Sequence, residues 1–154
     1  MDSLATGRIA LMSIKPQYAE AILAGTKRIE FRKRKLADDI SAVVIYSTLP
    51  VGQIVGVFSV LTCEIASPTA LWEKHRHHAG IGRAAYRNYY RGNSTAVGIL
   101  INDALALDVP VPLPQAWPSV RPPQCLAYLQ PAPSLSETIT RLFPPPLGAF
   151  AGTR

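Results

Sequence analysis

The sequence is short of cysteine and of long apolar runs, and both shortages narrow the class of protein. Its 154 residues include 2 cysteines, too few for the disulfide framework of a small secreted domain. No apolar stretch reaches the roughly 20 residues that cross a bilayer. The N-terminal segment MDSLATGR has no basic region followed by an apolar run, which is the pattern of a signal peptide. We therefore expect a cytoplasmic protein with no membrane partner.

Acidic residues are also few in comparison with basic ones. The chain has 16 Lys and Arg against 10 Asp and Glu, which gives a net charge of +6. A small basic domain suits a polyanionic partner, usually a nucleic acid. The hydrophobic share of 48% excludes a disordered chain, and the length predicts one domain. RNA or a nucleotide is the expected partner; DNA stays open, because residue types do not report 2′-hydroxyl contacts.

Residues that bind metal ions are few and poorly spaced. The 3 histidines are His75, His77 and His78. His75 and His78 would share one face of a helix, with Glu73 close to them. No cysteine or further acid is spaced to complete a ligand set. We expect neither a metal ion nor an organic cofactor.

Hydrophobic patterns and turn signals predict a mixed α/β fold. We expect strands over residues 9–14, 30–34, 42–48, 53–64 and 95–107, with an edge strand over 124–129. We expect helices over residues 16–24, 68–77, 83–90 and 134–142, the last capped by Ser134. From Pro110 to Pro146 the chain has 11 of its 14 prolines, which predicts an extended segment with little helix or sheet. Residues 1–7 and 143–154 are expected to be loose ends, and Trp72 and Trp117 to lie in the core or a lid.

The most informative stretch runs from Ser13 to Arg34, SIKPQYAEAILAGTKRIEFRKR. Pro16 suits a first helical turn, and the spacing of Tyr18 and Ile22 predicts that both face the core. Gly25 suits a left-handed helix end. Lys27 follows at the junction with the next strand, close enough for its ammonium to meet the carboxylate of Glu30. In that strand Arg28, Glu30 and Arg32 would share one face.

The motif Gly25-x-Lys27-x-x-Glu30, with its flanks and an RPPQ segment at residues 121–124, resembles the ASCH domain of the PUA-like superfamily. The resemblance covers residues 8–130 and leaves 131–154 as a C-terminal extension, partly extended or frayed. It implies a small PUA-like β-barrel of about five to six strands with short flanking helices and a cleft between them.

The resemblance also implies several activities. Some ASCH proteins are amidohydrolases on N4-acetylcytidine, in which the motif lysine works with a threonine three residues later and a distant glutamate. Here Glu30 stands in place of that threonine, and Glu64 is our candidate for the distant acid. Other members are suggested to cleave RNA, and some are described as transcription coactivators. Lys27, Glu30 and Glu64 are therefore the candidate catalytic residues.

The basic run around the motif is a candidate nucleic-acid face. Its members are Lys27, Arg28, Arg32, Lys33, Arg34 and Lys35. Lysine and arginine bind phosphates by charge, and arginine adds a bidentate fork. The alternative is a solvated strand edge whose charges prevent aggregation. For Lys27 and Glu30 the alternative is a salt bridge that fastens the loop to the strand.

A second basic feature lies on the helix expected over residues 83–90. Arg83, Arg87 and Arg91 share one face at a spacing of four, and Tyr86 and Tyr90 lie between them. Arginine beside aromatic rings suits single-stranded nucleic acid, because rings stack on bases while charges bind the backbone. We predict nucleic-acid contacts at Arg83, Arg87 and Tyr90. The alternative is a solvated helix face with half-packed tyrosines.

Three functions follow from these features. The first is an RNA-binding module that holds a nucleotide or a short single strand in a basic cleft above Lys27 and Glu30. The second is a small hydrolase, acting either on N4-acetylcytidine or as a ribonuclease. The third is a regulatory module whose protein partner contacts the proline-rich stretch.

Overall fold

The backbone forms one open, strongly bent sheet. The computed structural model describes residues 7–143. The 6 strands are hydrogen-bonded in the order β2-β5-β4-β3-β1-β6. Their bounds are β1 (Ile9–Ile14), β2 (Ile29–Arg32), β3 (Ala42–Ser47), β4 (Gln53–Ala66), β5 (Ala96–Val111) and β6 (Leu126–Leu129). β1 and β3 run parallel, and every other neighbouring pair is antiparallel.

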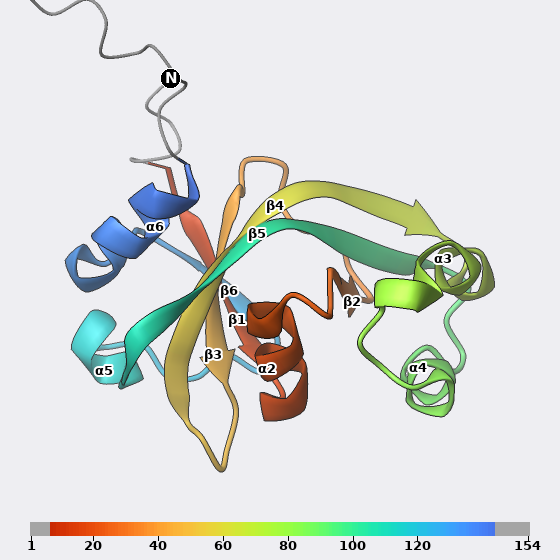
Figure 1. The fold of residues 1–154 in the computed structure, drawn as a ribbon, viewed down its shortest axis with the longest axis horizontal. Helices are drawn as coiled ribbons and strands as arrows, with labels where there is room; N and C mark the ends of the chain where they lie inside the picture. Colours follow the sequence, from red (N-terminus) through yellow and green to blue (C-terminus); the bar gives the residue numbers. More distant parts are fainter. Residues whose placement is uncertain (1–6, 144–154) are drawn as a thin grey trace, which may run out of the picture.

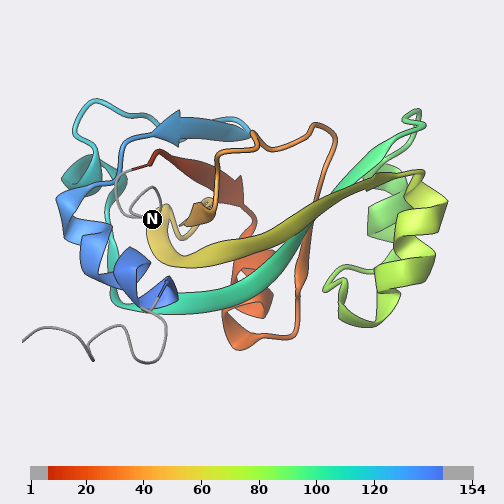
Figure 2. The same ribbon diagram turned by 90° about the horizontal axis from the view of Figure 1, so that it is seen from above.

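Two long strands give the sheet its curvature. β4 has 14 residues and β5 has 16. The register of this pair shifts between Ile54 and Gly56, and twice more between Ser59 and Thr62. Such bulges bend a strand and increase its twist. The sheet therefore curls into a half-barrel, and one end of the β4–β5 pair, with the short β2 alongside β5, continues beyond it as an arm (Figures 1 and 2).

Short helices cover the half-barrel and the end of the arm. Their bounds are α2 (Pro16–Ala24), α3 (Pro68–His75), η1 (Arg76–His78), α4 (Arg83–Tyr89), α5 (Leu113–Ala116), η2 (Pro133–Leu135) and α6 (Ser136–Leu142). α3 begins where the Ser67 hydroxyl accepts a hydrogen bond from the backbone N–H of Ala70. α3 and α4 lie together at the end of the arm, whereas α5 and α6 lie at the opposite end of the molecule (Figure 1).

Three clusters of buried apolar residues hold these layers together. One packs the sheet against α5 and α6 and includes Leu113 and Leu135. A second includes Ile22 of α2. The third joins Phe31 of β2 to Tyr86 of α4. This last cluster fixes the helices of the arm against the edge strand that carries the motif.

The predicted mixed α/β fold with a small barrel of about six strands and short helices is confirmed, with an open half-barrel as its form. β1 and α2 have the predicted bounds. Within the proline-rich stretch, the predicted edge strand and last helix are present as β6 and α6, whereas β5, which runs through Pro110 to Val111, and α5 were not predicted there. Pro110 fits in β5 because β2 pairs only as far as Leu100, so that β5 is an edge strand there.

The C-terminal part differs from the prediction in one further detail. Ser134 lies in η2, and α6 begins at Ser136 without a side-chain cap. Leu135, Ile139 and Leu142 are buried, so residues 131–143 contribute to the core. The loose ends predicted over 1–7 and 143–154 fall almost wholly outside the described residues, and a domain boundary near residue 130 stays a prediction. Within 7–143, no helix is both long and apolar enough to cross a membrane.

Candidate functional site

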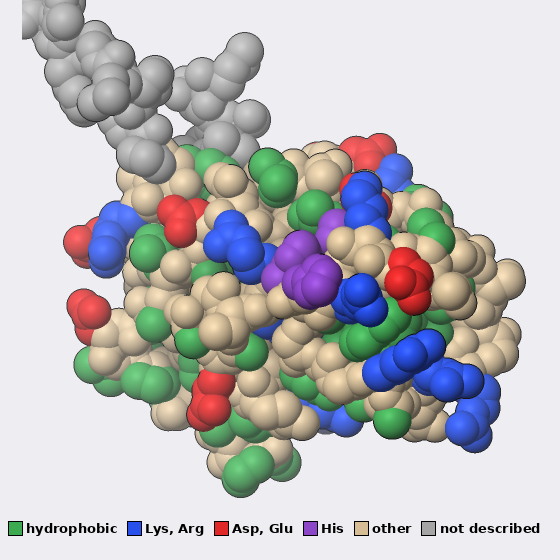
Figure 3. All heavy atoms as spheres, turned by 45° about the vertical axis from the view of Figure 1, so that its right-hand side comes forward, with side chains coloured by type: hydrophobic (Ala, Val, Ile, Leu, Met, Phe, Trp, Pro, Cys, Tyr) green, Lys and Arg blue, Asp and Glu red, His purple; other side chains and the backbone are tan. Residues whose placement is uncertain are grey.

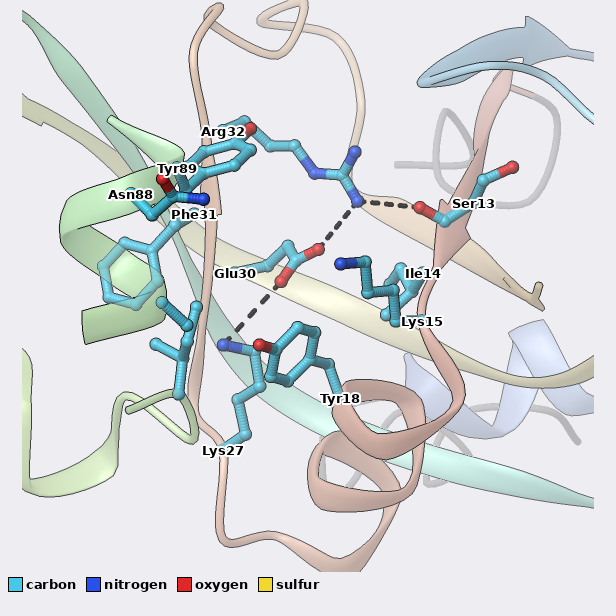
Figure 4. A pocket seen from close by; sticks show the side chains of 12 residues that line it. Ser13, Ile14, Lys15, Tyr18, Lys27, Glu30, Phe31, Arg32, Asn88 and Tyr89 are labelled. Carbon is cyan, nitrogen blue, oxygen red and sulfur yellow. Dashed lines mark hydrogen bonds and ion pairs between the residues drawn. The ribbon is translucent and has the colours of Figure 1, made fainter. Parts of the chain in front are cut away.

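A pocket of about 290 Å³ opens beside the motif, between the half-barrel and α4. α2 ends at Gly25, which has a φ of 84° and so adopts the left-handed cap conformation. The backbone N–H groups of Thr26 and Lys27 both donate to the carbonyl of Ala21. This tight turn directs Lys27 into the molecule and feeds the chain into β2, as Figure 4 shows.

Lys27 forms the floor of this pocket. Its side chain is 2% exposed. Its Nζ donates to the carbonyl of Ala79 at 2.6 Å and lies 3.8 Å from Oε1 of Glu30. Nζ also lies 5.3 Å from the ring centroid of Tyr18 and 5.0 Å from that of Phe31. Burial lowers the pKa of the Lys27 ammonium below its usual range, and the charge of Glu30 opposes that shift. The predicted Lys27–Glu30 contact is therefore present and buried.

Glu30 also pairs with Arg32, which closes a chain of charges across the pocket. Nη2 of Arg32 donates to Oε2 of Glu30 at 2.7 Å and to the carbonyl of Ser13 at 3.0 Å. Within residues 7–143, Nε of Arg32 is buried and has no hydrogen-bond partner. Two cations thus flank one carboxylate, which leaves the site with a surplus of positive charge.

Aromatic and small polar side chains complete the walls. The pocket is lined by Ser13, Ile14, Lys15, Tyr18, Lys27, Glu30, Phe31, Arg32, Ile81, Ala85, Asn88 and Tyr89. Tyr18 and Tyr89 approach from opposite sides, and Lys15 directs its ammonium inward (Figure 4). The arrangement suits a flat, anionic ligand, because rings contact a base while cations contact a phosphate.

Sequence reasoning did not find several of these residues. Tyr18 packs in part on the core, as predicted, but its place in the wall of the pocket was not predicted. Asn88 and Tyr89 come from α4, and no local pattern brings α4 to β2. Lys15 could have been predicted as a site residue, because it lies in the loop between a predicted strand and a predicted helix, and binding residues are common in such loops.

Most of the predicted basic run lies outside the pocket. Arg28 is exposed, and its guanidinium donates to the carbonyl of Asn102 at 3.1 Å. Nζ of Lys33 lies over the ring of Tyr89, 4.9 Å from its centroid, and Lys33 does not line the pocket. Arg34 is exposed and does not line the pocket. Among the basic residues between positions 27 and 35, the structure brings only Lys27 and Arg32 into contact with Glu30.

Glu64 is not brought to the motif. Its Oε2 accepts a hydrogen bond from Nζ of Lys74 at 2.6 Å, and its Oε1 lies 2.5 Å from Nε2 of His75. These two partners hold the pKa of the Glu64 carboxyl below its usual range. Glu64 does not line the pocket, so it has no direct contact with a ligand bound over Lys27. The expected constellation of Lys27, Glu30 and Glu64 is therefore not formed.

Arg83, Arg87 and Tyr90 lie on the other side of α4. They line a second hollow, between α3 and α4, together with Trp72. Tyr90 is 3% exposed, and its hydroxyl donates to the carbonyl of Arg32 at 2.8 Å. Its ring therefore has no free face for a base, and the predicted stacking on Tyr90 finds no support.

Comparisons with known proteins agree with this fold and motif. The sequence profile of the ASCH domain matches residues 12–105. An ASCH domain-containing ribonuclease of Zymomonas mobilis is 29% identical over 134 residues, which cover 84% of this chain and 90% of that protein. The crystal structure of ASCH from Zymomonas mobilis superposes with a TM-score of 0.75 and 27% identity, over 87% of this chain and 94% of that one.

A more distant structural match shares the fold with this chain at low sequence identity. The N-terminal domain of McrB from Staphylothermus marinus has a TM-score of 0.52 at 12% identity, over 86% of this chain and 93% of that one. At this identity the likeness concerns the fold alone. The profile match spans more than half of the chain and includes the motif. This protein is therefore a member of the ASCH domain family, with a PUA-like fold.

Proposed function

We propose that this protein binds single-stranded RNA and cleaves it in the Lys27 pocket. The observation that carries the proposal is a buried lysine of lowered pKa at the floor of a nucleotide-sized, aromatic-walled pocket. The similarity of this chain to a protein named as an ASCH domain-containing ribonuclease supports the same proposal.

The pocket offers a complementary group for each part of a nucleotide. A base fits between Tyr18 and Tyr89, which form opposite walls. The phosphate lies toward Lys15 and Arg32, whose charges are not fully balanced by Glu30. The ribose is then placed over Lys27. Each of these contacts is available to RNA in single-stranded form, since an unstacked base is needed to enter the pocket.

The reaction follows from the chemistry of Lys27. In its neutral form the amine accepts the proton of the ribose 2′-hydroxyl while that oxygen attacks the adjacent phosphorus. The bond from phosphorus to the 5′-oxygen breaks, and the leaving oxygen takes a proton from water. The products are a 2′,3′-cyclic phosphate and a 5′-hydroxyl end. Arg32 stabilises the charge that develops on the phosphoryl oxygens.

The test uses a variant that keeps the volume of Lys27. Lys27→Met should abolish cleavage of an end-labelled single-stranded RNA, measured by gel electrophoresis. Lys35→Met is the matched control, because it removes one lysine charge that is paired with Asp38 outside the pocket. A strand with 2′-O-methyl groups should bind and stay intact. Cleavage by Lys27→Met at the wild-type rate would refute the assignment, as would the absence of cleavage by the wild type.

The same lysine supports a second candidate reaction. Lys27 and Glu30, 3.8 Å apart in a nucleoside-sized pocket, are placed to activate a water molecule against an amide. N4-acetylcytidine is the substrate that the family suggests. Release of acetate from that nucleoside, with RNA left intact, would favour this reaction over strand cleavage. A regulatory role through a protein partner stays a prediction.

A further inference from the structure

The hollow between α3 and α4 combines aromatic and basic side chains, as a nucleotide site does. It has a volume of about 390 Å³, comparable with the Lys27 pocket. Trp72 and Glu73 come from α3, and Arg83 and Arg87 from α4. On this face of the molecule, basic side chains border an apolar patch (Figure 3). We call this hollow the α3–α4 groove.

Trp72 gives the groove an aromatic surface on a rigid base. It is half-buried, and its ring centroid lies 4.8 Å from that of Tyr86 at an interplanar angle of 39°. Tyr86 is itself fixed, because its hydroxyl donates to the carbonyl of Pro68 at 2.7 Å. Trp72 packs in part on the core cluster that contains Phe31 and Tyr86, as expected, and it also lines the groove.

Arg83 and Arg87 supply charge that the described protein does not neutralise. Within residues 7–143, neither guanidinium forms an ion pair. Both are exposed and stand one helical turn apart on the same face of α4. Glu73 is the one acid that lines the groove, so the groove carries more positive than negative charge. Arginine beside an accessible aromatic ring is the combination that binds bases and phosphates of single strands, and the half-buried Trp72 leaves part of its ring to the groove.

α4 separates the groove from the Lys27 pocket. Ala85, Asn88 and Tyr89 face the pocket, whereas Arg83 and Arg87 face the groove. A helix with its side chains is about 10–12 Å across. A strand that crosses α4 therefore reaches both hollows with a few nucleotides.

We propose that the α3–α4 groove binds a second nucleotide of the RNA strand, with its base on Trp72 and its phosphate on Arg83 and Arg87. The proposal rests on the proposed RNA function, and it sets a minimum strand length. A mononucleotide fills one hollow only. A hexanucleotide fills both and binds more tightly.

The experiment follows the fluorescence of Trp72. In a Trp117→Phe protein, Trp72 is the remaining tryptophan of the sequence. Titration with a 2′-O-methyl hexanucleotide should quench its emission with a saturable curve. Replacing Arg83 and Arg87 by glutamine should weaken binding at least tenfold. The slope of log affinity against log salt should also become less steep by about 1.4, as expected for two lost phosphate contacts on a single strand. Glu73→Gln should strengthen binding.

Matched controls separate the groove from general charge. Arg76 and Arg91 are exposed near the groove but do not line it, so replacing both by glutamine removes the same charge elsewhere. Equal losses of affinity in the two double variants would overturn the proposal, as would an unchanged Trp72 emission. Lys27→Met should keep the Trp72 response while it loses cleavage. If the strand changes the Trp72 emission but the wild type does not cleave RNA, the role of Lys27 is refuted and the groove is not. If the wild type cleaves RNA but the Trp72 emission does not change, the groove is refuted and the role of Lys27 is not.

Discussion

Removing one partner of the buried pair of Glu30 and Arg32 should destabilise the protein far more than removing one partner of an exposed pair. Arg32 and Glu30 are 11% and 8% exposed and their charged atoms lie 2.7 Å apart. Arg8 and Asp39 lie 2.6 Å apart but are 38% and 55% exposed. Glu30→Gln leaves the Arg32 guanidinium buried without its counter-charge, whereas Asp39→Asn leaves Arg8 in water. The exposed pair has two hydrogen bonds and the buried pair has one, so a larger loss for Glu30→Gln cannot come from the number of hydrogen bonds.

The expected magnitude follows from the loss of one partner. Breaking a buried pair in this way costs about 3–5 kcal/mol. The glutamine amide keeps the shape of Glu30 and one accepting oxygen, which recovers about 1 kcal/mol. We therefore expect the free energy of unfolding to fall by about 3 kcal/mol, against a total of about 5–15 kcal/mol for a domain. The protein should still fold.

Urea unfolding followed by tryptophan fluorescence measures this loss. With a slope of about 2 kcal/mol per molar urea, the midpoint should move by about 1.5 M for Glu30→Gln. Asp39→Asn should unfold at nearly the urea concentration of the wild type, because exposed pairs are screened by solvent. Equal midpoints for the two variants would refute the reasoning that burial sets the cost of leaving one charge of a pair without its partner.

Three further predictions test the motif and its surroundings. Cleavage should accelerate as pH rises through the pKa of Lys27, which lies below 10.5, because the neutral amine is the reactive form; Lys27→Arg stays protonated and should bind RNA without cleaving it, in a pH–rate series. Gly80→Ala places a Cβ 2.4 Å from Cβ of Lys27 at a φ of +63°, so it should cost about 2–4 kcal/mol in urea unfolding and slow cleavage, whereas Gly92→Ala, at a φ of +79° with no atom within 4 Å of the added Cβ, should cost only about 1–2 kcal/mol and leave cleavage unchanged. Burial first, and then the neighbouring His75, lower the pKa of His78 from 6.5. The folded state then binds fewer protons than the unfolded state, so the free energy of unfolding should fall as pH drops through 6.5, and this dependence should weaken in His78→Gln.

The sequence predicted what is local in the site. The turn from Gly25 to Lys27 depends on the chemistry of adjacent residues, and so does the meeting of Lys27 with Glu30. Tyr89 and Asn88 could not be found, because their place depends on the packing of α4 against a strand more than fifty residues earlier. Such a contact leaves no periodic trace in the sequence.

The place of Glu64 depends on tertiary packing and not on its own strand. The register of β4 on β5 shifts between Ser59 and Val60, and the second shift, between Val60 and Thr62, restores it before Glu64 is reached. The carboxylate is held by Lys74 and His75 of α3, which contact it from ten or more residues away in the sequence. No pattern within the strand predicts these partners.

The bend of β4 and β5 has a geometric consequence for the pocket. One wall, with Tyr18, comes from α2, and another, with Tyr89, comes from α4 at the end of the arm. The bulges around Val60 set the direction in which this part of the strand pair leaves the half-barrel. Residues of β4 that do not line the pocket therefore help to fix the separation of its walls.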